Sequence, residues 1–459
     1  MACAALLAGC AAGPDYVRPE PLATAGFARA EAGVFTVAAA EAEFWRRFDD
    51  PLLVMLVTET FSFNHDLRAA AARYERARAL YRQARFDRLP TVTAGGTAAD
   101  VRSSADQVPG ATRAQRDQES YELGVEATWE ADFFGRVRRA VEAQRALTEA
   151  GAADLAALQV ALAGEVVRGY FELRGMQQQL QVARGNADNQ AESLRVVEAR
   201  LDAGRGIELD VARARAQLAG TLARIPALEA DIAAAMHRIA VLTGRPPGAL
   251  IATLAESAPL PALPGEVPVG TPADLLRRRP DLVAAERRLA AATARSGVAT
   301  ADLFPRITLG GLVGTQAADA GALFGRDSET RVVALGVDWT FLDVGRVRAR
   351  IAAADADADA WLADYQQTVL LALEETENAM VRVVRSRQEQ AHLEQAAADS
   401  ASAARLARLR FDGGAADFLH VLDAERARLD AEDRLVQGRT RMAFALVALY
   451  RSLAGGWTL

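Results

Sequence analysis

The chain has 459 residues, of which 51% are apolar and 25% are charged, and its formal net charge is −7. This acidic balance argues against nucleic-acid binding, which needs a basic surface or stripe. Both cysteines lie in the first ten residues, and the four histidines stand far apart. We therefore predict no catalytic site, no cofactor and no metal site in the folded body. We also find no run of about 18 apolar residues that predicts a transmembrane helix.

The N-terminus begins with a short apolar leader, residues 1–9, that lacks a basic region and fits a signal peptide with a truncated or misassigned start. The stretch Leu7-Ala8-Gly9-Cys10 resembles a bacterial lipobox, at which the cysteine is diacylated and becomes the mature N-terminus. We therefore predict a covalent lipid on Cys10 and a lipidated segment over residues 10–60. Two or three acyl chains anchor a protein stably. The alternative is a frayed apolar terminus with a chance cysteine.

The next segment carries a helical pattern from about Asn64 to Leu89, which ends at Pro90. Two strands are predicted after it, at about residues 90–100 and 119–134. The second strand shows strict period-two alternation, which places its apolar side chains on one face. These apolar side chains are Tyr121, Leu123, Val125, Ala127 and Trp129, and they alternate with Glu122, Gly124, Glu126, Thr128 and Glu130.

After Gly135 come roughly 65 residues without proline or a turn cluster, which correspond to about 100 Å of helix. Apolar residues step through this stretch by three and four, the spacing of a coiled-coil seam. They are Leu155, Leu158, Leu162, Val166, Tyr170, Leu173, Met176 and Leu180. A helix of this length needs partner helices along it.

The sequence then repeats its own plan with an offset near 210 residues. Gly135-Arg136-Val137-Arg138 recurs as Gly345-Arg346-Val347-Arg348, and Trp129 is echoed by Trp339. We predict a first repeat over residues 61–245 and a second over 273–454. A Pro-rich linker through which helix cannot run, residues 246–272, joins them, and a tail follows at 455–459. The second repeat has predicted strands at about 305–315 and 331–343.

Strands of about ten residues with one apolar face have the length and pattern of membrane β-strands. Trp129 and Trp339 end their strands where an interfacial aromatic belt would lie. Four strands cannot close a barrel, and open edges are not tolerated in lipid. Three chains would supply twelve strands. The alternative is a pair of half-buried hairpins on a soluble helical domain.

Several stretches in register along the chain resemble the NodT-type outer-membrane efflux lipoproteins of the TolC-like outer-membrane factor family. The most specific is Leu275-Leu276-Arg277-Arg278-Arg279-Pro280-Asp281-Leu282 with Ala285-Glu286. The others are Gly13-Pro14-Asp15-Tyr16-Val17-Arg18-Pro19, Phe44-Trp45-Arg46-Arg47-Phe48-Asp49-Asp50-Pro51-Leu52, Asn64-His65-Asp66-Leu67, Leu419-His420-Val421-Leu422-Asp423-Ala424-Glu425 and Ala454-Gly455-Gly456-Trp457.

This resemblance implies a mainly α fold with membrane β, internally duplicated, with four strands per chain in a trimeric twelve-stranded β-barrel continued by a long periplasmic α-helical barrel. It implies a lipid-anchored, non-enzymatic duct in the bacterial outer membrane that contacts outer-membrane lipid. The implied partners are two further copies of the chain, a periplasmic adaptor and a proton-driven inner-membrane transporter. The implied cargo is small toxic compounds, drugs or metal ions.

The resemblance also implies a periplasmic gate at the helical hairpin tips. Leu419 matches an apolar ring and Asp423 an acidic ring, one helical turn apart. Arg410 matches a residue that links neighbouring hairpins, through Asp202 or Asp210 of the first repeat. Phe411 stands where the family often has tyrosine, so we expect a looser or differently wired link.

Two alternatives stay open at this stage. One is a type I secretion duct with the same fold, and the other is a soluble coiled-coil scaffold. In addition, the charged residues at the tip also fit an ordinary solvated helix face. The two repeats differ there, because Leu209 and Arg213 of the first stand where the second has Leu419 and Asp423.

Overall fold

The structure is a computed structural model that describes residues 11–454 except 21–25, 32 and 40. The described chain forms two compact units, and each unit draws on both sequence repeats. The strand unit consists of the described residues of Met1–Glu20, Arg73–Ala152 and Ala284–Gln366. The helical unit consists of those of Pro21–Ala72, Ala153–Val283 and Gln367–Leu459.

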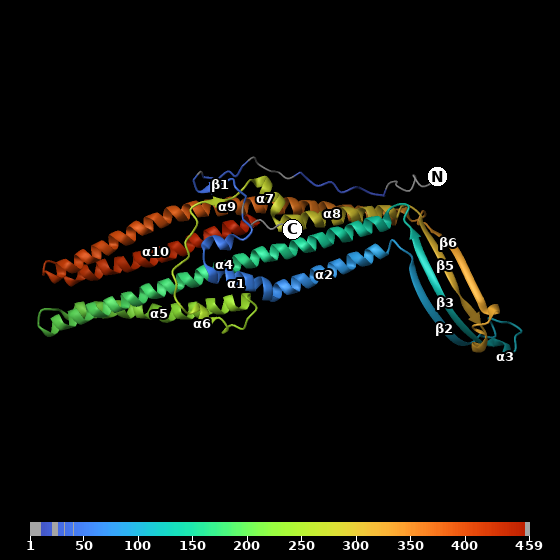
Figure 1. Cartoon of the computed structure of the whole chain (residues 1–459), viewed down its shortest axis with the longest axis horizontal. Coiled ribbons are helices and arrows are strands. Elements are labelled where there is room, and N and C mark those ends of the chain that lie inside the picture. The colour runs from blue at the N-terminus through green and yellow to red at the C-terminus, as the bar shows by residue number, and fades with distance from the viewer. Residues whose placement is uncertain (1–10, 21–25, 32, 40, 455–459) are drawn as a thin grey trace. The chain divides into compact units, whose positions relative to one another are not determined.

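The strand unit contains an antiparallel four-stranded sheet with the order β2-β3-β5-β6 (Figure 1). The strands are β2 (Thr91–Arg102), β3 (Asp117–Ala131), β5 (Arg306–Ala317) and β6 (Glu329–Asp338). The first three lie within a few residues of the predicted strands. Strand β6 ends at Asp338, five residues before the predicted end at 343, so Trp339 follows the strand instead of lying in it. The loop between β2 and β3 contains α3 (Arg113–Arg116). The loop between β5 and β6 contains η3 (Ala320–Ala322) and η4 (Arg326–Ser328).

Each strand pair is preceded by a helix of 22 residues, α2 (His65–Phe86) or α8 (Pro280–Ala301). Proline explains why both helices stop. Pro90 and Pro305 disfavour helical geometry at the residue before them and cannot donate a backbone hydrogen bond. The chain therefore becomes extended directly afterwards, as β2 and β5.

The longest helices are α4 (Arg136–Asp202, 67 residues) and α9 (Val344–Asp412, 69 residues). Each is followed by a 35-residue helix, α5 (Glu208–Leu242) or α10 (Phe418–Ser452) (Figure 1). The two turns have the same backbone design, because Gly204 and Gly414 have φ values of 69° and 71°. Glycine reaches this left-handed region without a steric penalty, so it closes each long helix.

The main core of the helical unit lies where α1 (Pro51–Phe63) and η2 (Phe44–Phe48) contact α4, α5, α9 and α10. All eight residues of the predicted α4 seam either belong to this core or pack against it. Tyr170, Phe171 and Leu173 are at most 1% exposed. The coiled-coil spacing therefore identified the buried stripe of the helix.

One sequence expectation was too strict. Helix α4 does contain a stretch long and apolar enough to span a membrane by length and composition. Half of that stretch is buried inside the protein, as expected for the core helix of a bundle. Alanine-rich sequence raises the hydropathy of the helix without forming a continuous run of large apolar side chains.

The Pro-rich linker is more structured than predicted. It contains one helical turn, α6 (Ile251–Leu254), between its prolines, and a short strand, β4 (Val267–Pro268). Strand β4 pairs in parallel with β1 (Phe35–Thr36). Helix α7 (Pro272–Arg278) follows, with the Thr271 side chain accepting a hydrogen bond from the Asp274 N–H. The linker is therefore fixed to the segment before α1.

Candidate functional site

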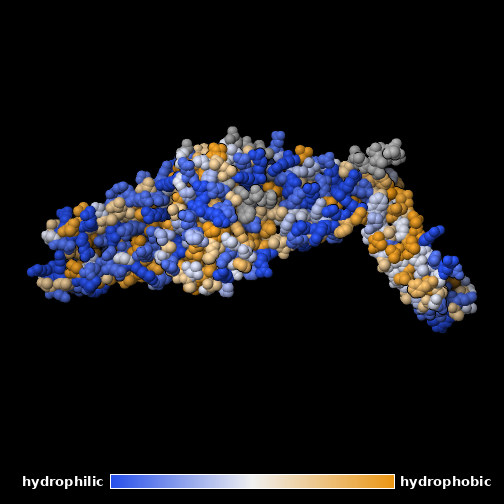
Figure 2. Space-filling view, in the orientation of Figure 1, coloured by the Kyte–Doolittle hydropathy of each residue, from blue (hydrophilic) through white to orange (hydrophobic). Residues whose placement is uncertain are grey.

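The four-stranded sheet has two chemically different faces. One face gathers large apolar side chains that are exposed in the chain, among them Val333 (83% exposed) and Leu335 (71% exposed). The strand register places the others beside them: Val92, Leu123, Val125, Trp129, Leu309, Val313 and Val337. Figure 2 shows apolar surface gathered along the strands. So much exposed apolar surface marks a face that is covered by lipid or by another protein.

The opposite face is polar over most of its area. Its side chains include Thr93, Thr97, Glu122, Glu126 and Thr128. Across the β3–β5 pairing, Gln316 donates a hydrogen bond of 2.7 Å to the Glu122 carboxylate. Leu312 and Val332, which pair with each other, are exceptions to this polarity. The sheet thus has the apolar-out, polar-in character of a barrel wall around water.

The sheet is also open. In the described chain, β2 pairs only with β3 and β6 pairs only with β5. Their outer edges therefore carry backbone groups without a strand partner in the chain. Such edges are templates for pairing with another strand.

The two predicted interface tryptophans make equivalent hydrogen bonds. The Trp129 indole N–H donates to the backbone carbonyl of Arg88 at 3.0 Å, and that of Trp339 donates to Leu303 at 3.0 Å. Both acceptors lie two residues before the proline that ends the preceding helix. Each tryptophan thus ties the end of one strand to the start of its partner strand. The sequence located both residues but not these partners.

The hairpin tips hold a small apolar cluster between the two repeats. It consists of Val197, Val211, Ala214, Phe411, Phe418 and Val421. Phe411 is 6% exposed, and its ring centroid lies 5.2 Å from that of Phe418. The guanidinium carbon of Arg200 lies 3.8 Å from the centroid of the Phe411 ring. The link at this position is thus a cation–π contact across the two long helices.

Leu419 and Asp423 are both exposed at the start of α10, one turn apart. Arg410 is exposed as well. In the described part of the chain, no hydrogen bond or ion pair joins its side chain to Asp202 or Asp210. Arg410 is therefore not joined to either aspartate within the described chain. Sequence reasoning assigned no role to Arg200 or Phe418, because nothing in the local sequence indicates that they contact Phe411.

Polar contacts farther from the tip join the two helical hairpins. Arg408 donates to the Ser193 hydroxyl at 2.8 Å, and Arg428 donates to the Asn186 amide oxygen at 3.3 Å. A third contact pairs Arg224 with Asp433 at 2.6 Å. These contacts lie on surfaces rich in charge, so the sequence alone gave no means of choosing them.

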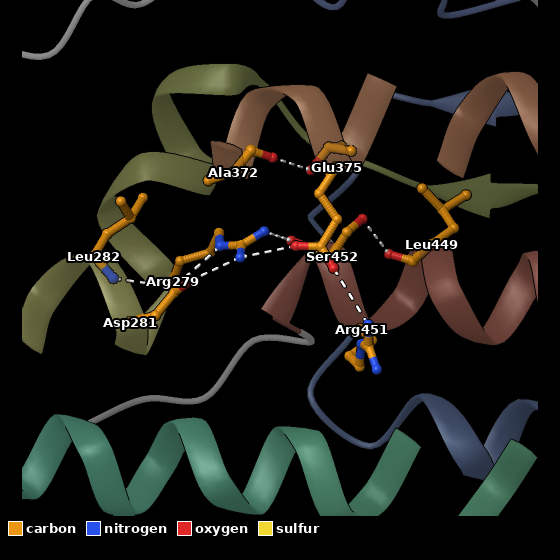
Figure 3. Close-up of polar contacts among 9 residues, drawn as sticks. Arg279, Asp281, Leu282, Ala372, Glu375, Leu449, Arg451 and Ser452 are labelled. Carbon is orange, nitrogen blue, oxygen red and sulfur yellow. Dashed lines mark hydrogen bonds and ion pairs between the residues drawn. The ribbon is translucent and has the colours of Figure 1, made fainter. Parts of the chain in front are cut away.

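Arg279, within the most specific family motif, lies at a junction of three helices (Figure 3). It is 9% exposed, and its guanidinium donates to the Ser452 carbonyl at 2.9 Å, to Asp281 at 2.7 Å and to Glu375 at 3.0 Å. Burial by itself lowers the pKa of this guanidinium. The hydrogen bond and charge of Asp281, together with Glu375, outweigh burial and raise the pKa. The motif is therefore a structural junction between α8, α9 and the end of α10.

The segment after the predicted lipid site lies along the strand unit. Arg139, 4% exposed, donates to the Asp15 carboxylate at 2.6 Å and to the Ala12 carbonyl at 3.3 Å. Farther along, the Tyr16 hydroxyl donates to Glu286. A Cβ on Gly135 would lie 2.6 Å from the Cβ of Ala11, so glycine permits this close approach.

Cys10 itself lies outside the described residues, as do residues 1–9, Gly455, Gly456 and Trp457. Among the described residues, no group of three or more His, Cys, Asp or Glu side chains is arranged to hold a metal ion.

Residues 56–245 and 271–455 match the family described as outer membrane efflux protein. The chain is 30% identical over 466 residues to nodulation protein T of Rhizobium leguminosarum bv. trifolii, covering 98% of this chain and 96% of that protein. It is 32% identical over 469 residues to the solvent efflux pump outer membrane protein SrpC of Pseudomonas putida, covering 99% and 97%. The solved structure of the outer-membrane channel OprN is 44% identical, with a TM-score of 0.91, and covers 98% of this chain and 100% of that chain.

These matches confirm both the resemblance and the fold, and they agree with the two-faced sheet and paired helical hairpins. The chain belongs to the outer-membrane efflux protein family and has the TolC-like fold of an outer-membrane efflux channel that extends into the periplasm.

Proposed function

We propose that three copies of this chain form the outer-membrane duct of a tripartite efflux system. The observation that carries the proposal is the open sheet with one exposed apolar face and two free edges. Pairing β6 of one copy with β2 of the next removes every edge and yields twelve strands. The apolar faces then meet lipid, and the polar faces line a water-filled lumen.

A covalent lipid on Cys10 would add an anchor to this barrel. Support comes from the lipobox and from the placement of Ala11, the next residue, against Gly135 at the start of α4. That position lies four residues after the end of β3, where a barrel strand would leave the membrane. Replacing Cys10 with serine and measuring incorporation of radiolabelled palmitate tests this part of the proposal directly.

The partners we propose are a periplasmic adaptor and a proton-driven inner-membrane transporter. The cargo we propose is small toxic compounds rather than polypeptides. The relatives support this choice over protein secretion, because one is named as part of a solvent efflux pump. We assign no catalytic role to the chain.

At the hairpin tips we propose a gate, in which Leu419 and Asp423 of three copies form an apolar and an acidic ring. Both side chains are exposed in the single chain, as residues that face a lumen must be. Three carboxylates at one level repel each other and attract cations. We propose that Arg410 of one copy pairs with Asp202 or Asp210 of the next, while Arg200 and Phe411 hold the hairpins of one copy together.

The central experiment is native mass measurement of protein extracted from outer membranes, followed by conductance in planar bilayers. We expect a trimer that forms discrete cation-preferring channels. A soluble monomer without conductance would contradict the duct. The gate is tested separately with Asp423→Asn and Arg410→Ala, which should raise the resting conductance. The exposed Asp430→Asn on the same helix serves as a control.

A further inference from the structure

The helical unit contains a pocket beneath the Pro-rich linker that the duct function leaves unexplained. Its volume of about 490 Å³ lies in the range of small-molecule sites. The linker segment from Pro259 to Gly265 forms one wall and has no helix or strand of its own. Its prolines lack N–H donors and hold the chain extended across the helices, which leaves a hollow instead of a packed contact.

The floor of the pocket is apolar. It is formed by Phe171 of α4, which is fully buried, and by Met442 and Ala443 of α10, which are at most 2% exposed. Leu260 and Leu263 add apolar surface from the linker. A ligand with a short hydrocarbon body would cover this floor and displace water from it.

Arg387 of α9 provides a cation at the wall of the pocket. Its guanidinium donates a hydrogen bond of 3.1 Å to the Pro264 carbonyl. In the described part of the chain, no carboxylate forms an ion pair with it. Burial lowers the pKa of this guanidinium, and the electrostatic effect of nearby Tyr450, which raises the pKa, does not outweigh it.

The other polar groups of the pocket do not supply the missing negative charge. Glu394 already accepts hydrogen bonds from Gln390 at 3.1 Å and from Arg439 at 3.3 Å. With Arg387 and Arg439 against Glu394, the lining has a formal charge of +1. In addition, the amide oxygen of Gln178 is buried without a hydrogen-bond partner among the described residues. Among the described residues, the lining therefore has one cation without an ion-pair partner and one buried acceptor without a donor.

We propose that this pocket binds a small amphipathic carboxylate. The carboxylate lies against the Arg387 guanidinium, whose planar fork suits two parallel hydrogen bonds. The hydrocarbon body lies on Phe171 and Met442. A hydroxyl or water carried with the ligand donates to Gln178. A neutral amphiphile leaves Arg387 without a counter-charge, and a cationic one is repelled. The proposal does not depend on the gate or on the transported cargo.

The test uses the full protein in zwitterionic nanodiscs and isothermal titration with octanoate, 1-octanol and octylammonium. We expect octanoate to bind at least tenfold more tightly than either comparator. Arg387→Gln keeps a donor for the Pro264 carbonyl but removes the charge and the paired donors. It should weaken octanoate binding at least roughly tenfold, because the charge-assisted hydrogen bonds to the carboxylate are lost. Arg387→Lys should recover part of the loss.

Two further variants distinguish the site from general effects. Arg385→Gln removes an exposed cation on the same helix, whose side chain donates a hydrogen bond to Gln388. It should leave octanoate binding unchanged. Ala391→Phe places a ring into the pocket from α9 and should abolish binding. Equal octanoate binding in wild type, Arg387→Gln and Ala391→Phe would overturn the proposal, as would octanol binding as tightly as octanoate or no octanoate binding at millimolar concentration.

Discussion

The guanidinium of Arg200 lies over the ring of Phe411, with 3.8 Å between the guanidinium carbon and the ring centroid. The two residues come from α4 and α9, so this contact joins the two repeats directly at the hairpin tips. It occupies the position at which the sequence suggested a lost tyrosine hydrogen bond. The aromatic face, rather than a hydroxyl, forms the link in this chain.

Arg200→Gln should therefore loosen the tip. A partly desolvated cation–π contact contributes about 1–2 kcal/mol, and its loss would raise the population of open tips roughly 5–30-fold. We expect a higher resting conductance in planar bilayers. Phe411→Tyr keeps the ring face and should behave as wild type. Arg205→Gln is the matched control, because Arg205 is exposed in the turn that directly follows α4. A folded Arg200→Gln protein with wild-type conductance would contradict this role.

Arg279→Lys should destabilise the helical unit. A single ammonium cannot satisfy the Ser452 carbonyl, Asp281 and Glu375 together, and breaking such a buried network costs about 3 kcal/mol. The measurement is thermal unfolding of the reconstituted protein. Arg277→Lys is the control, because the Arg277 side chain is 67% exposed and pairs with Asp274 on the same helix. Similar unfolding temperatures for both variants would show that the junction contributes little.

The two faces of β6 should respond differently to charge. Val333 lies on the apolar face and Ala334 on the opposite face. Val333→Arg should cost about 2–4 kcal/mol, the penalty for arginine facing lipid near the bilayer centre, and should reduce the amount of assembled protein in outer membranes. Ala334→Arg should assemble normally and lower cation preference in bilayer recordings. If Ala334→Arg failed to assemble and Val333→Arg assembled normally, the face assigned to lipid would instead line the lumen.

Trp129→Phe and Trp339→Phe test the duplicated anchors. Each keeps an aromatic ring but removes an indole donor, so each should cost about 1 kcal/mol. The two effects should add, because the bonds share no partner. Hydrogen exchange of the amides around Pro90 and Pro305 is the direct readout. Unchanged protection in the double variant would mean that the rings alone hold the strand ends.

Because of Tyr170, we expect the free energy of unfolding to fall at high pH. Burial and the 2.6 Å hydrogen bond to Asp50 raise the pKa of Tyr170 to about 12. The unfolded chain loses this proton near pH 10. The stabilisation is thus fully present below pH 10 and is lost as pH rises through about 12. Tyr170→Phe should be less stable by about 1 kcal/mol at pH 7. That difference should shrink between pH 10 and 12 in chemical denaturation, and a constant difference would contradict it.

Much of this fold was accessible from the sequence because its signals are local. Period-two alternation marked the strands, spacing by three and four marked the α4 seam, and Pro90 marked the end of the helical pattern before the first strand. The partners were not accessible. Arg387, Arg200 and Arg408 look alike in a chain with many arginines, yet one lies in a pocket, one over a ring and one beside a serine. Such differences arise only from tertiary packing.

The sheet order has a consequence for how the duct is put together. Within the sheet of one chain, the two repeats meet where β3 pairs with β5, the second strand of the first repeat with the first strand of the second. In the proposed trimer, β6 pairs with β2 of the next copy. This again joins the second strand of one repeat to the first strand of another repeat. The closed barrel therefore has six equivalent pairings between repeats. Three of them lie within single chains, and three form between chains. A chain carrying a single repeat would have to bring six bodies together, and assembly would cost the translational and rotational entropy of five of them. This chain brings three bodies together and loses that of two, so duplication lowers the entropic cost of assembly by more than half.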